Sequence, residues 1–345
     1  MKFTDTPIDK QPTIDKQTPI YVFGNTEYTD VLLKDFNVIG IIDDFSSEAL
    51  IKGVERVSLS NIRPDATIIS TVNNSRAFHA MQMLRDKSFK NCLFIGSLIN
   101  QYPSSFKHTY LYQAQHAMRQ LDAQMQQVAA SFADETSHQQ FSQIVNFRKT
   151  LNINFLSEMK VKIDQQYFEP FVYEQAFDCL LDGGAYDGHD SQQFVDIFPN
   201  YQKIYLIEPQ SENLALIHKR FQSEPRCELV HACLGSRANT VRLSGEGTSA
   251  KIAEEGELVA MRTIDSFKTS GKTLVKLDIE GAEVDCLKGA MNALSDPSYS
   301  FAISAYHLPN DFWDIYQILN AAPIKRKFYF RHYSSGFAES VIFAV

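Results

Sequence analysis

Short apolar runs alternate with stretches of helical spacing in the first part of the chain. The apolar runs predict strands at residues 19–24, 37–45, 66–71 and 91–99. Between them, residues 26–35 and 75–87 carry apolar side chains at the spacing of a helix. Strands that alternate with helices indicate a parallel, doubly wound sheet. We therefore expect a small α/β domain at residues 19–104, preceded by a polar tail at residues 1–18.

The pattern changes between residues 105 and 168, where long Gln-rich stretches contain neither Gly nor Pro. Apolar residues recur there at three-to-four spacing, which predicts amphipathic helices. We expect a helical connector at residues 105–168, and its surface is the candidate contact for a homo-oligomer.

The alternation of strands and helices resumes in a last predicted domain, residues 169–345. Apolar strands are predicted at residues 178–184, 203–209, 227–235, 273–281 and 298–307. The final stretch, residues 327–345, indicates two strands separated by a Ser-Ser-Gly turn. An antiparallel hairpin that closes a mostly parallel sheet is a common arrangement in mixed sheets.

The charge and the composition of the chain argue against a nucleic-acid partner and against a membrane-spanning segment. A net charge of −8 argues against a nucleic acid bound through its phosphates, because such binding needs a basic surface. No apolar run approaches the roughly 20 residues that span a bilayer, and the polar N-terminus lacks the apolar core of a secretory signal. The five cysteines are scattered without a CxxC pair, which favours reduced thiols in the cytoplasm.

A loop rich in carboxylates and glycines, residues 180–194, is the first candidate site. Its acids, Asp182, Asp187 and Asp190, lack the alternating spacing and closing Glu of a calcium loop, so a metal is not favoured. The Gly-Lys-Ser/Thr ending of a phosphate-binding P-loop is also missing. The remaining interpretation is a strand, a glycine turn and a helix at the edge where open α/β sheets bind nucleotides.

The charge of this loop favours a cationic nucleoside. The glycines let the backbone approach a ligand closely, while an anionic Asp182 would repel phosphate and suits the sulfonium of S-adenosylmethionine. Glu208 ends the next predicted strand, 20 positions after Gly188, where a carboxylate can accept both ribose hydroxyls. The alternative for Glu208 is an acid that stabilises a helix N-terminus through the helix dipole.

A third charged group lies in VKLDIEGAEVDCLKGA, residues 275–290. Lys276, Asp278 and Glu280 follow one another at the two-residue period of a strand face. Three ionisable groups at the end of one strand suit substrate positioning and general acid/base chemistry. The alternative is a solvated helix N-terminus that attracts acids through the dipole.

At this point the chain resembles the FkbM-type methyltransferase family. The resemblance rests on LDGGAYDG (181–188), YLIEP (205–209), RTIDSF (262–267) and VKLDIEGAEVDCLKGA (275–290), with ISAYHLPNDFWDIYQIL and a terminal RHY segment after them. It covers roughly residues 177–345. It implies a seven-strand, Rossmann-like fold that uses S-adenosylmethionine, and a small-molecule or glycan hydroxyl as the acceptor.

The resemblance also assigns roles to residues. The methionine end of the cofactor would be lined by Asp182, Gly183, Gly184, Ala185 and Gly188, and the ribose would be held by Glu208. Asp278, Glu280 and His307 would face the transferring methyl group, with Lys276 beside them as a further catalytic candidate. His307 is the best candidate for the general base because its ordinary pKa is near neutrality; a structural histidine, or a carboxylate base, is the alternative.

The first domain carries a weaker signal. Gly24 follows the first predicted strand, Asp43 lies 19 positions later, and IIDDF is similar to the N-terminal domain of sugar acyltransferases. The second and third glycines of a dinucleotide fingerprint are absent, so a Rossmann-like sugar-nucleotide-binding domain and a purely structural domain both stay open. The leading hypothesis for the chain is O-methylation of a sugar. Its rivals are a nucleotide-dependent oxidoreductase or epimerase and a non-catalytic scaffold.

Overall fold

The computed structural model describes residues 13–245 and 251–345, so most of the expected polar tail lies outside the described residues. The chain divides into two compact units. Unit 1 comprises the chain up to Ala129 together with Gln139–Lys162 and His332–Ala338, and unit 2 comprises Ala130–His138, Ile163–Arg331 and Glu339–Val345. Among the helices of the described residues, none combines the length and apolar character needed to cross a membrane.

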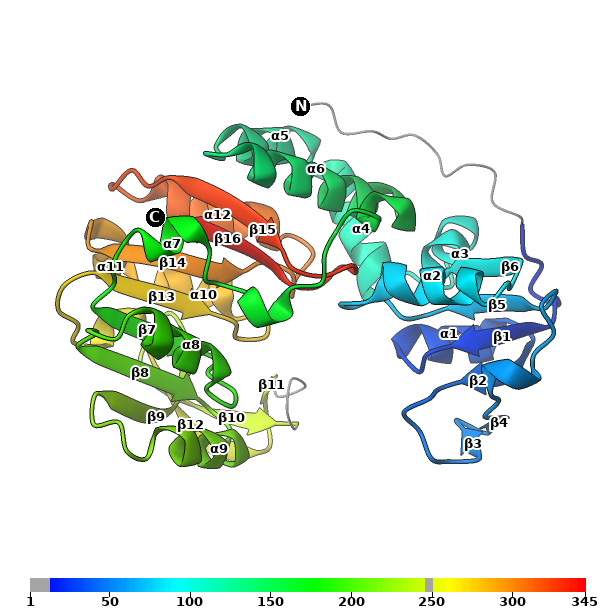
Figure 1. Ribbon diagram of the computed structural model, residues 1–345, viewed down its shortest axis with the longest axis horizontal. Helices are drawn as coiled ribbons and strands as arrows, with labels where there is room; N and C mark the ends of the chain where they lie inside the picture. Colours follow the sequence, from blue (N-terminus) through cyan, green and yellow to red (C-terminus); the bar gives the residue numbers. More distant parts are fainter. Residues whose placement is uncertain (1–12, 246–250) are drawn as a thin grey trace. The chain divides into compact units, whose positions relative to one another are not determined.

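Unit 1 contains a four-stranded parallel sheet, as the alternating pattern predicts (Figure 1). Its strand order is β2 (Val38–Ile42), β1 (Ile20–Phe23), β5 (Thr67–Ser70) and β6 (Asn91–Phe94). Helix α1 (Glu27–Asp35) begins at Thr26, whose hydroxyl accepts a hydrogen bond from the backbone N–H of Tyr28. Helix α2 (Ala77–Asp86) buries its apolar face, including Met81 and Leu84. A two-stranded hairpin, β3 (Leu50–Ile51) and β4 (Val54–Glu55), follows β2.

The fourth predicted strand, residues 91–99, is wrong in its second half. Strand β6 ends at Phe94, and helix α3 (Ile95–Gln101) begins directly after it. Residues 95–99 are all buried. A continuous apolar run is equally typical of a buried strand and a buried helix, so periodicity alone does not separate the two.

The Gln-rich middle of the chain is helical, as predicted. It forms α4 (Tyr110–Gln120), α5 (Asp122–Ala130) and α6 (Glu135–Thr150), followed by two short 3₁₀ turns, η2 (Ile153–Leu156) and η3 (Ile163–Gln165). The buried residues of α4 recur at helical spacing, as Leu111, Ala114, Gln115 and Met118.

Unit 2 is built on a sheet that has ten strands among the described residues (Figure 1). Seven of them follow the order β9, β8, β7, β13, β14, β16 and β15. Their bounds are Cys227–Leu234, Lys203–Glu208, Cys179–Gly183, Thr273–Leu277, Tyr299–Ser304, Ser340–Ala344 and Phe328–His332, respectively. The first five pair in parallel, while β16 is antiparallel to β14. Strand β15 lies beside β16, and the backbones of Lys327 and Val345 exchange two hydrogen bonds, so the predicted closing hairpin is confirmed.

Three further strands extend the sheet beyond β9, so the expected count of seven strands is too low. They are β12 (Glu257–Arg262), β10 (Asn239–Ser244) and β11 (Lys251–Ala253), and β12 pairs in parallel with β9. The residues of β10 are exposed or half-buried along its whole length. Strands of this kind lack the apolar run that marks a buried strand, which is why the sequence pattern does not reveal them.

The buried centre of this sheet positions the candidate site. Strands β7 and β13 are buried at every position, as expected for parallel strands covered on both faces. The chain leaves β7 toward β8 on one side, and β13 lies on the other side. This is a topological switch point, where open α/β sheets bind ligands outside the carboxyl ends of the strands. Helices α8 (His189–Ile197), α9 (Ser211–Phe221), α10 (Glu283–Lys288), α11 (Met291–Ser295) and α12 (Asp311–Ala321) follow the strands.

Candidate active site

The glycine turn after β7 is tied to both neighbouring strands. The backbone N–H groups of Gly184 and Ala185 donate to the carbonyl of Ile207 on β8, and the Gly183 carbonyl accepts from the N–H of Asp278 after β13. Gly184 has φ +74, and a Cβ at this position would lie 1.9 Å from the carbonyl oxygen of Asp278. Only glycine fits such a position. The turn and the loop after β13 are therefore in direct backbone contact.

Gly188 begins helix α8 in the same left-handed conformation, with φ +78. A Cβ there would lie 2.8 Å from the ring of Phe221. Asp187 beside it forms an ion pair with Arg220, at 3.0 Å, and its other oxygen accepts the backbone N–H of His189. These contacts shape the turn, and they give Asp187 a structural role.

Asp182 is fully buried one residue before the glycines. One carboxylate oxygen accepts a hydrogen bond from the hydroxyl of Ser191 at 2.7 Å. The other lies 3.0 Å from the ammonium of Lys276. The negative charge of Asp182 is thus compensated inside the protein, and the expectation that it directly attracts a sulfonium is not what this geometry favours.

Lys276 contacts the glycine turn and the acids beside it. Its ammonium donates to the carbonyl of Gly184 at 2.9 Å and lies 3.0 Å from Asp182 and 3.3 Å from Asp190. Burial lowers the pKa of Lys276, but the surrounding carboxylates, above all Asp182, outweigh burial and hold that pKa above its ordinary value. The ammonium is therefore held by one hydrogen bond to the turn and by two ion pairs. We therefore interpret Lys276 as the residue that fixes the turn.

Glu208 ends β8 next to the same turn. Its carboxylate accepts the backbone N–H groups of Tyr186, at 3.0 Å, and Gln210, at 2.9 Å, and the side-chain amide of Asn213 at 3.2 Å. Burial raises the pKa of Glu208, and these hydrogen bonds oppose that effect. Since two carboxylate oxygens offer about four acceptor sites, the group is held in place with acceptor capacity left for a ligand.

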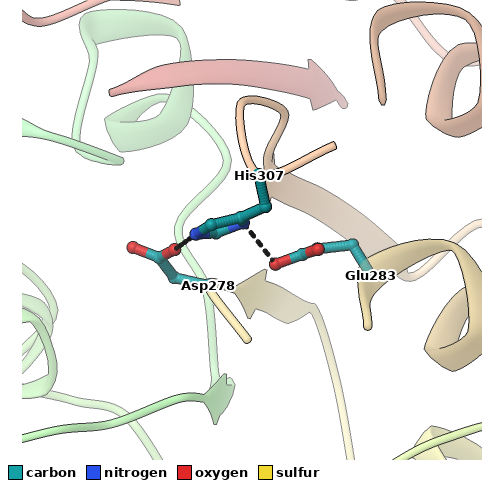
Figure 2. A group of neighbouring side chains, drawn as sticks. All are labelled: Asp278, Glu283 and His307. Carbon is teal, nitrogen blue, oxygen red and sulfur yellow. Dashed lines mark ion pairs between the residues drawn. The ribbon is translucent and has the colours of Figure 1, made fainter. Parts of the chain in front are cut away.

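A second group of side chains, which we call the acid cluster, consists of Asp278, Glu280, Glu283 and His307. Asp278 and Glu280 follow β13, Glu283 is the first residue of α10, and His307 follows β14. Glu280 has φ +56, an unusual conformation for a residue other than glycine. Together with Gly281 at φ +96, it turns the chain sharply between the strand and the helix. Figure 2 shows the His307 ring between the carboxylates of Asp278 and Glu283.

His307 is surrounded by carboxylates on both sides of its ring. Its Nε2 lies 3.3 Å from Asp278 and 3.6 Å from Glu280, and its Nδ1 lies 3.0 Å from Glu283. Burial lowers the pKa of His307, but Glu283 and then the other carboxylates outweigh it and raise this pKa to about 9. The imidazole is therefore charged at neutral pH. A general base has to begin unprotonated, so the raised pKa argues against His307 as a base at pH 7.

Two tyrosines hold Asp278, and the sequence alone did not reveal either. The hydroxyl of Tyr167 donates to Asp278 at 2.8 Å and also lies 2.9 Å from the hydroxyl of Ser304. The hydroxyl of Tyr306 donates to the other Asp278 oxygen at 3.2 Å. Tyr167 lies 111 positions before Asp278 in the chain, so no local spacing connects the two residues.

The predicted site residues thus form two adjoining groups. The first surrounds the glycine turn and contains Asp182, Gly183, Gly184, Ala185, Gly188, Glu208 and also Lys276. The second is the acid cluster, which contains the predicted Asp278, Glu280 and His307 and adds Glu283. The backbone contact between Gly184 and Asp278 joins the two groups.

A family model described as "Methyltransferase FkbM domain" matches residues 182–330. The matched segment contains both groups of site residues, whereas Tyr167 lies before it. The resemblance inferred from the sequence motifs is therefore confirmed over this part of the chain. No curated protein matches the sequence.

Solved structures also resemble this chain. Methyltransferase FkbM from Methylobacillus flagellatus KT aligns with a TM-score of 0.77 at 20% identity, covering 96% of this chain and 90% of that one. Two others cover only about half of this chain. One is precorrin-6y C5,15-methyltransferase from Geobacter metallireducens GS-15, with a TM-score of 0.32 at 14% identity, covering 55% of this chain and 94% of that one. The other is a SAM-dependent methyltransferase from Aquifex aeolicus, with a TM-score of 0.31 at 12% identity, covering 56% of this chain and 97% of that one. The first likeness shows a shared fold, and the other two add nothing to it.

Proposed function

We propose that this chain, a methyltransferase of the FkbM family, transfers the methyl group of S-adenosylmethionine to a hydroxyl of a sugar in a polysaccharide or glycoconjugate. One observation carries the proposal. The glycine turn after β7 and the acid cluster after β13 are in backbone contact at Gly184 and Asp278. A cofactor held at the turn would thus present its methyl group beside side chains that can hold an acceptor.

The cofactor half of the site follows from the glycine turn and Glu208. The turn lies at the topological switch point, where its backbone can approach a nucleoside closely. Glu208 keeps acceptor capacity for one ribose hydroxyl, on the oxygen that accepts the N–H of Tyr186. Because Lys276 compensates Asp182, the negative charge that favours a sulfonium comes from the acid cluster.

The acceptor half follows from the chemistry of the acid cluster. Three carboxylates surround one imidazole, so the cluster carries net negative charge and repels a phosphate or carboxylate acceptor. Carboxylate oxygens accept hydrogen bonds readily from neutral hydroxyls. A neutral polyol, such as a sugar without an acidic group at the reacting position, is therefore the substrate class that suits this surface.

The reaction itself is an in-line displacement. The bond between the sulfonium sulfur and the methyl carbon breaks, a bond from the acceptor oxygen to that carbon forms, and the electron pair stays on sulfur, giving S-adenosylhomocysteine. The hydroxyl proton leaves to a base. Positioning and deprotonation of the acceptor are what the side chains can supply, and Asp278 and Glu280, with 24% and 39% of their side chains exposed, are accessible to an acceptor.

Calorimetry of the full chain with S-adenosylmethionine and, separately, with NAD tests the cofactor. We expect S-adenosylmethionine to bind and NAD not to bind. Binding of NAD alone would favour an oxidoreductase, and binding of neither would favour a scaffold. Mass spectrometry of cell-surface glycans, with and without the protein, tests the acceptor: without the protein we expect a sugar to be lighter by about 14 Da, the net difference when CH₃ no longer replaces a hydroxyl hydrogen.

A further inference from the structure

The acid cluster contains more negative than positive groups. Asp278, Glu280 and Glu283 all lie within 3.6 Å of the His307 ring. The side chain of His307 is only 9% exposed, and that of Glu283 only 1%. Solvent therefore screens these groups weakly. Buried carboxylates that are not matched by cations are costly, and they normally pair with a positive charge or coordinate a metal.

The two nitrogens of His307 face different partners. Nδ1 lies beside Glu283, while Nε2 lies beside both Asp278 and Glu280, an arrangement that Figure 2 shows for Asp278 and Glu283. A histidine that binds a metal through one nitrogen almost always turns its other nitrogen toward a carboxylate or carbonyl. In His307 the nitrogen that faces such a carboxylate is Nδ1, beside Glu283. The other nitrogen, Nε2, faces Asp278 and Glu280, the two acids that are partly exposed to solvent.

Several buried atoms of the cluster lack good hydrogen bonds. Neither nitrogen of His307 is aligned for a hydrogen bond with any described residue, in spite of the short distances to the carboxylates, and Oε2 of Glu283 has no such partner either. Asp278 is different, because the hydroxyl of Tyr167 donates to its Oδ2 and the hydroxyl of Tyr306 donates to its Oδ1, the oxygen that also lies beside Nε2 of His307. Metal-bound carboxylates are commonly held in this way by an outer hydrogen bond.

We propose that His307 Nε2, Asp278 and Glu280 bind a divalent metal ion, with the Nε2 proton released to solvent as the ion binds and with Glu283 orienting the imidazole. The distances of 3.3 and 3.6 Å from Nε2 to the two carboxylates are close to the separation of neighbouring ligands around one ion. Ligands at about 2.1–2.3 Å from a metal and at right angles lie about 3 Å apart. One nitrogen and two oxygens fill only part of the coordination shell of Mg²⁺, Mn²⁺ or Zn²⁺.

The open positions of such an ion deepen the proposed function, on which this inference rests. A metal beside the glycine turn would bind oxygens of the acceptor and lower the pKa of a bound hydroxyl. It would also match the net negative charge of the cluster. Two neighbouring hydroxyls can bind one ion together, so the substrate class becomes a neutral vicinal diol, as many sugars present.

Titration of the metal-stripped full chain with Mn²⁺ tests the site, with free Mn²⁺ followed by electron paramagnetic resonance. We expect one Mn²⁺ per chain, bound at least tenfold more weakly in His307→Gln and Glu280→Gln. Glu283→Gln should weaken binding by roughly 10–100-fold, as changes behind a metal-bound histidine do. His218→Gln, on the exposed side of α9, is the matched control and should bind like the unmodified chain. Absence of Mn²⁺ binding, or equal binding in Glu280→Gln, overturns the proposal.

Glu280→Gln keeps the test valid if His307→Gln fails to fold, because the Glu280 side chain is 39% exposed. Calorimetry with S-adenosylmethionine in the presence of EDTA separates this inference from the proposed function. Cofactor binding together with full methyl transfer in EDTA would overturn the metal site alone. Loss of cofactor binding in both the presence and absence of metal would overturn the proposed function, while the Mn²⁺ titration would still decide the metal site.

Discussion

Replacing Gly184 with Ala is the sharpest test of how the two halves of the site are joined. Gly184 has φ +74, and an added Cβ would lie 1.9 Å from the carbonyl oxygen of Asp278 and 2.9 Å from its carbonyl carbon. Gly53, in the turn between β3 and β4, has a similar φ of +82, but an added Cβ there meets nothing within 4 Å. Gly53→Ala is therefore a matched control that has the same backbone strain without the clash.

The expected magnitudes follow from this difference. An alanine in the left-handed region costs about 1 kcal/mol relative to glycine, and Gly53→Ala should show this cost alone. At Gly184 the methyl group also has to displace backbone that is hydrogen-bonded on both sides, since Gly183 accepts the N–H of Asp278 and Gly184 donates to Ile207. Overpacking of this kind costs about 1–3 kcal/mol more. We expect Gly184→Ala to lose about 2–4 kcal/mol of folding free energy.

The binding assay is calorimetry with S-adenosylmethionine, accompanied by urea unfolding. Because the turn and Asp278 must move apart, we expect Gly184→Ala to bind the cofactor at least tenfold more weakly, and Gly53→Ala to bind it normally. Gly184→Ala with the same affinity and the same stability as Gly53→Ala would refute the reasoning. That result would mean that the turn tolerates the displacement and that its contact with Asp278 is not what shapes the site.

Three further changes test other parts of the structure. Lys276→Met leaves the buried Asp182 carboxylate uncompensated and should cost about 3–5 kcal/mol in urea unfolding, part of which Lys276→Met/Asp182→Asn should recover; no recovery would contradict the ion pair. Glu208→Gln should weaken S-adenosylmethionine binding by about 10–100-fold through lost charge-assisted hydrogen bonds, and unchanged affinity would exclude a ribose contact. It should also cost about 1–3 kcal/mol of folding free energy, because the amide NH₂ faces a backbone N–H that the carboxylate accepts, from Tyr186 or Gln210. Burial first, and the charge of Arg148 second, lower the pKa of His332 to about 3 in the folded chain. Below about pH 6.5 the unfolded chain therefore takes up a proton at this histidine, while the folded chain does not. The free energy of unfolding should fall by about 2 kcal/mol between pH 6.5 and pH 5 as a result. His332→Gln should reduce that fall, and urea unfolding at both pH values measures it.

The sequence alone predicted those site residues that directly follow a strand with a clear apolar pattern. The glycine turn and Glu208 each sit at the end of a strand with a strong apolar pattern, so their place at one sheet edge could be inferred from strand alternation alone. Tyr167 could not be found this way, because its contact with Asp278 spans 111 positions and the surrounding residues carry no motif. Strand β10, next to the edge strand β11, was missed for a different reason, since its exposed and half-buried residues give no apolar run.

Lys276 shows how a correct local rule led to the wrong grouping. The two-residue period of a strand placed Lys276, Asp278 and Glu280 on one face. Strand β13 ends at Leu277, however, and Glu280 adopts φ +56 directly after it. The strand period therefore stops between the lysine and the acids. As a result, Lys276 contacts the glycine turn, while Asp278 and Glu280 lie beside the imidazole of His307.

The negative charge of Asp182 is neutralised by a nearby cation, whereas the negative charge of the acid cluster is neutralised only in part. This difference indicates where a cationic ligand should bind. Asp182 is fully buried and has Lys276 at 3.0 Å, so its charge is matched inside the protein and fixes the turn. The acid cluster has three carboxylates around a single imidazole, and Glu280 is partly exposed. The charge that is still unmatched thus lies at the open side of the site, beside the turn. A sulfonium and a divalent ion are both cations that this position would attract, and the cofactor and metal titrations measure the two contributions separately.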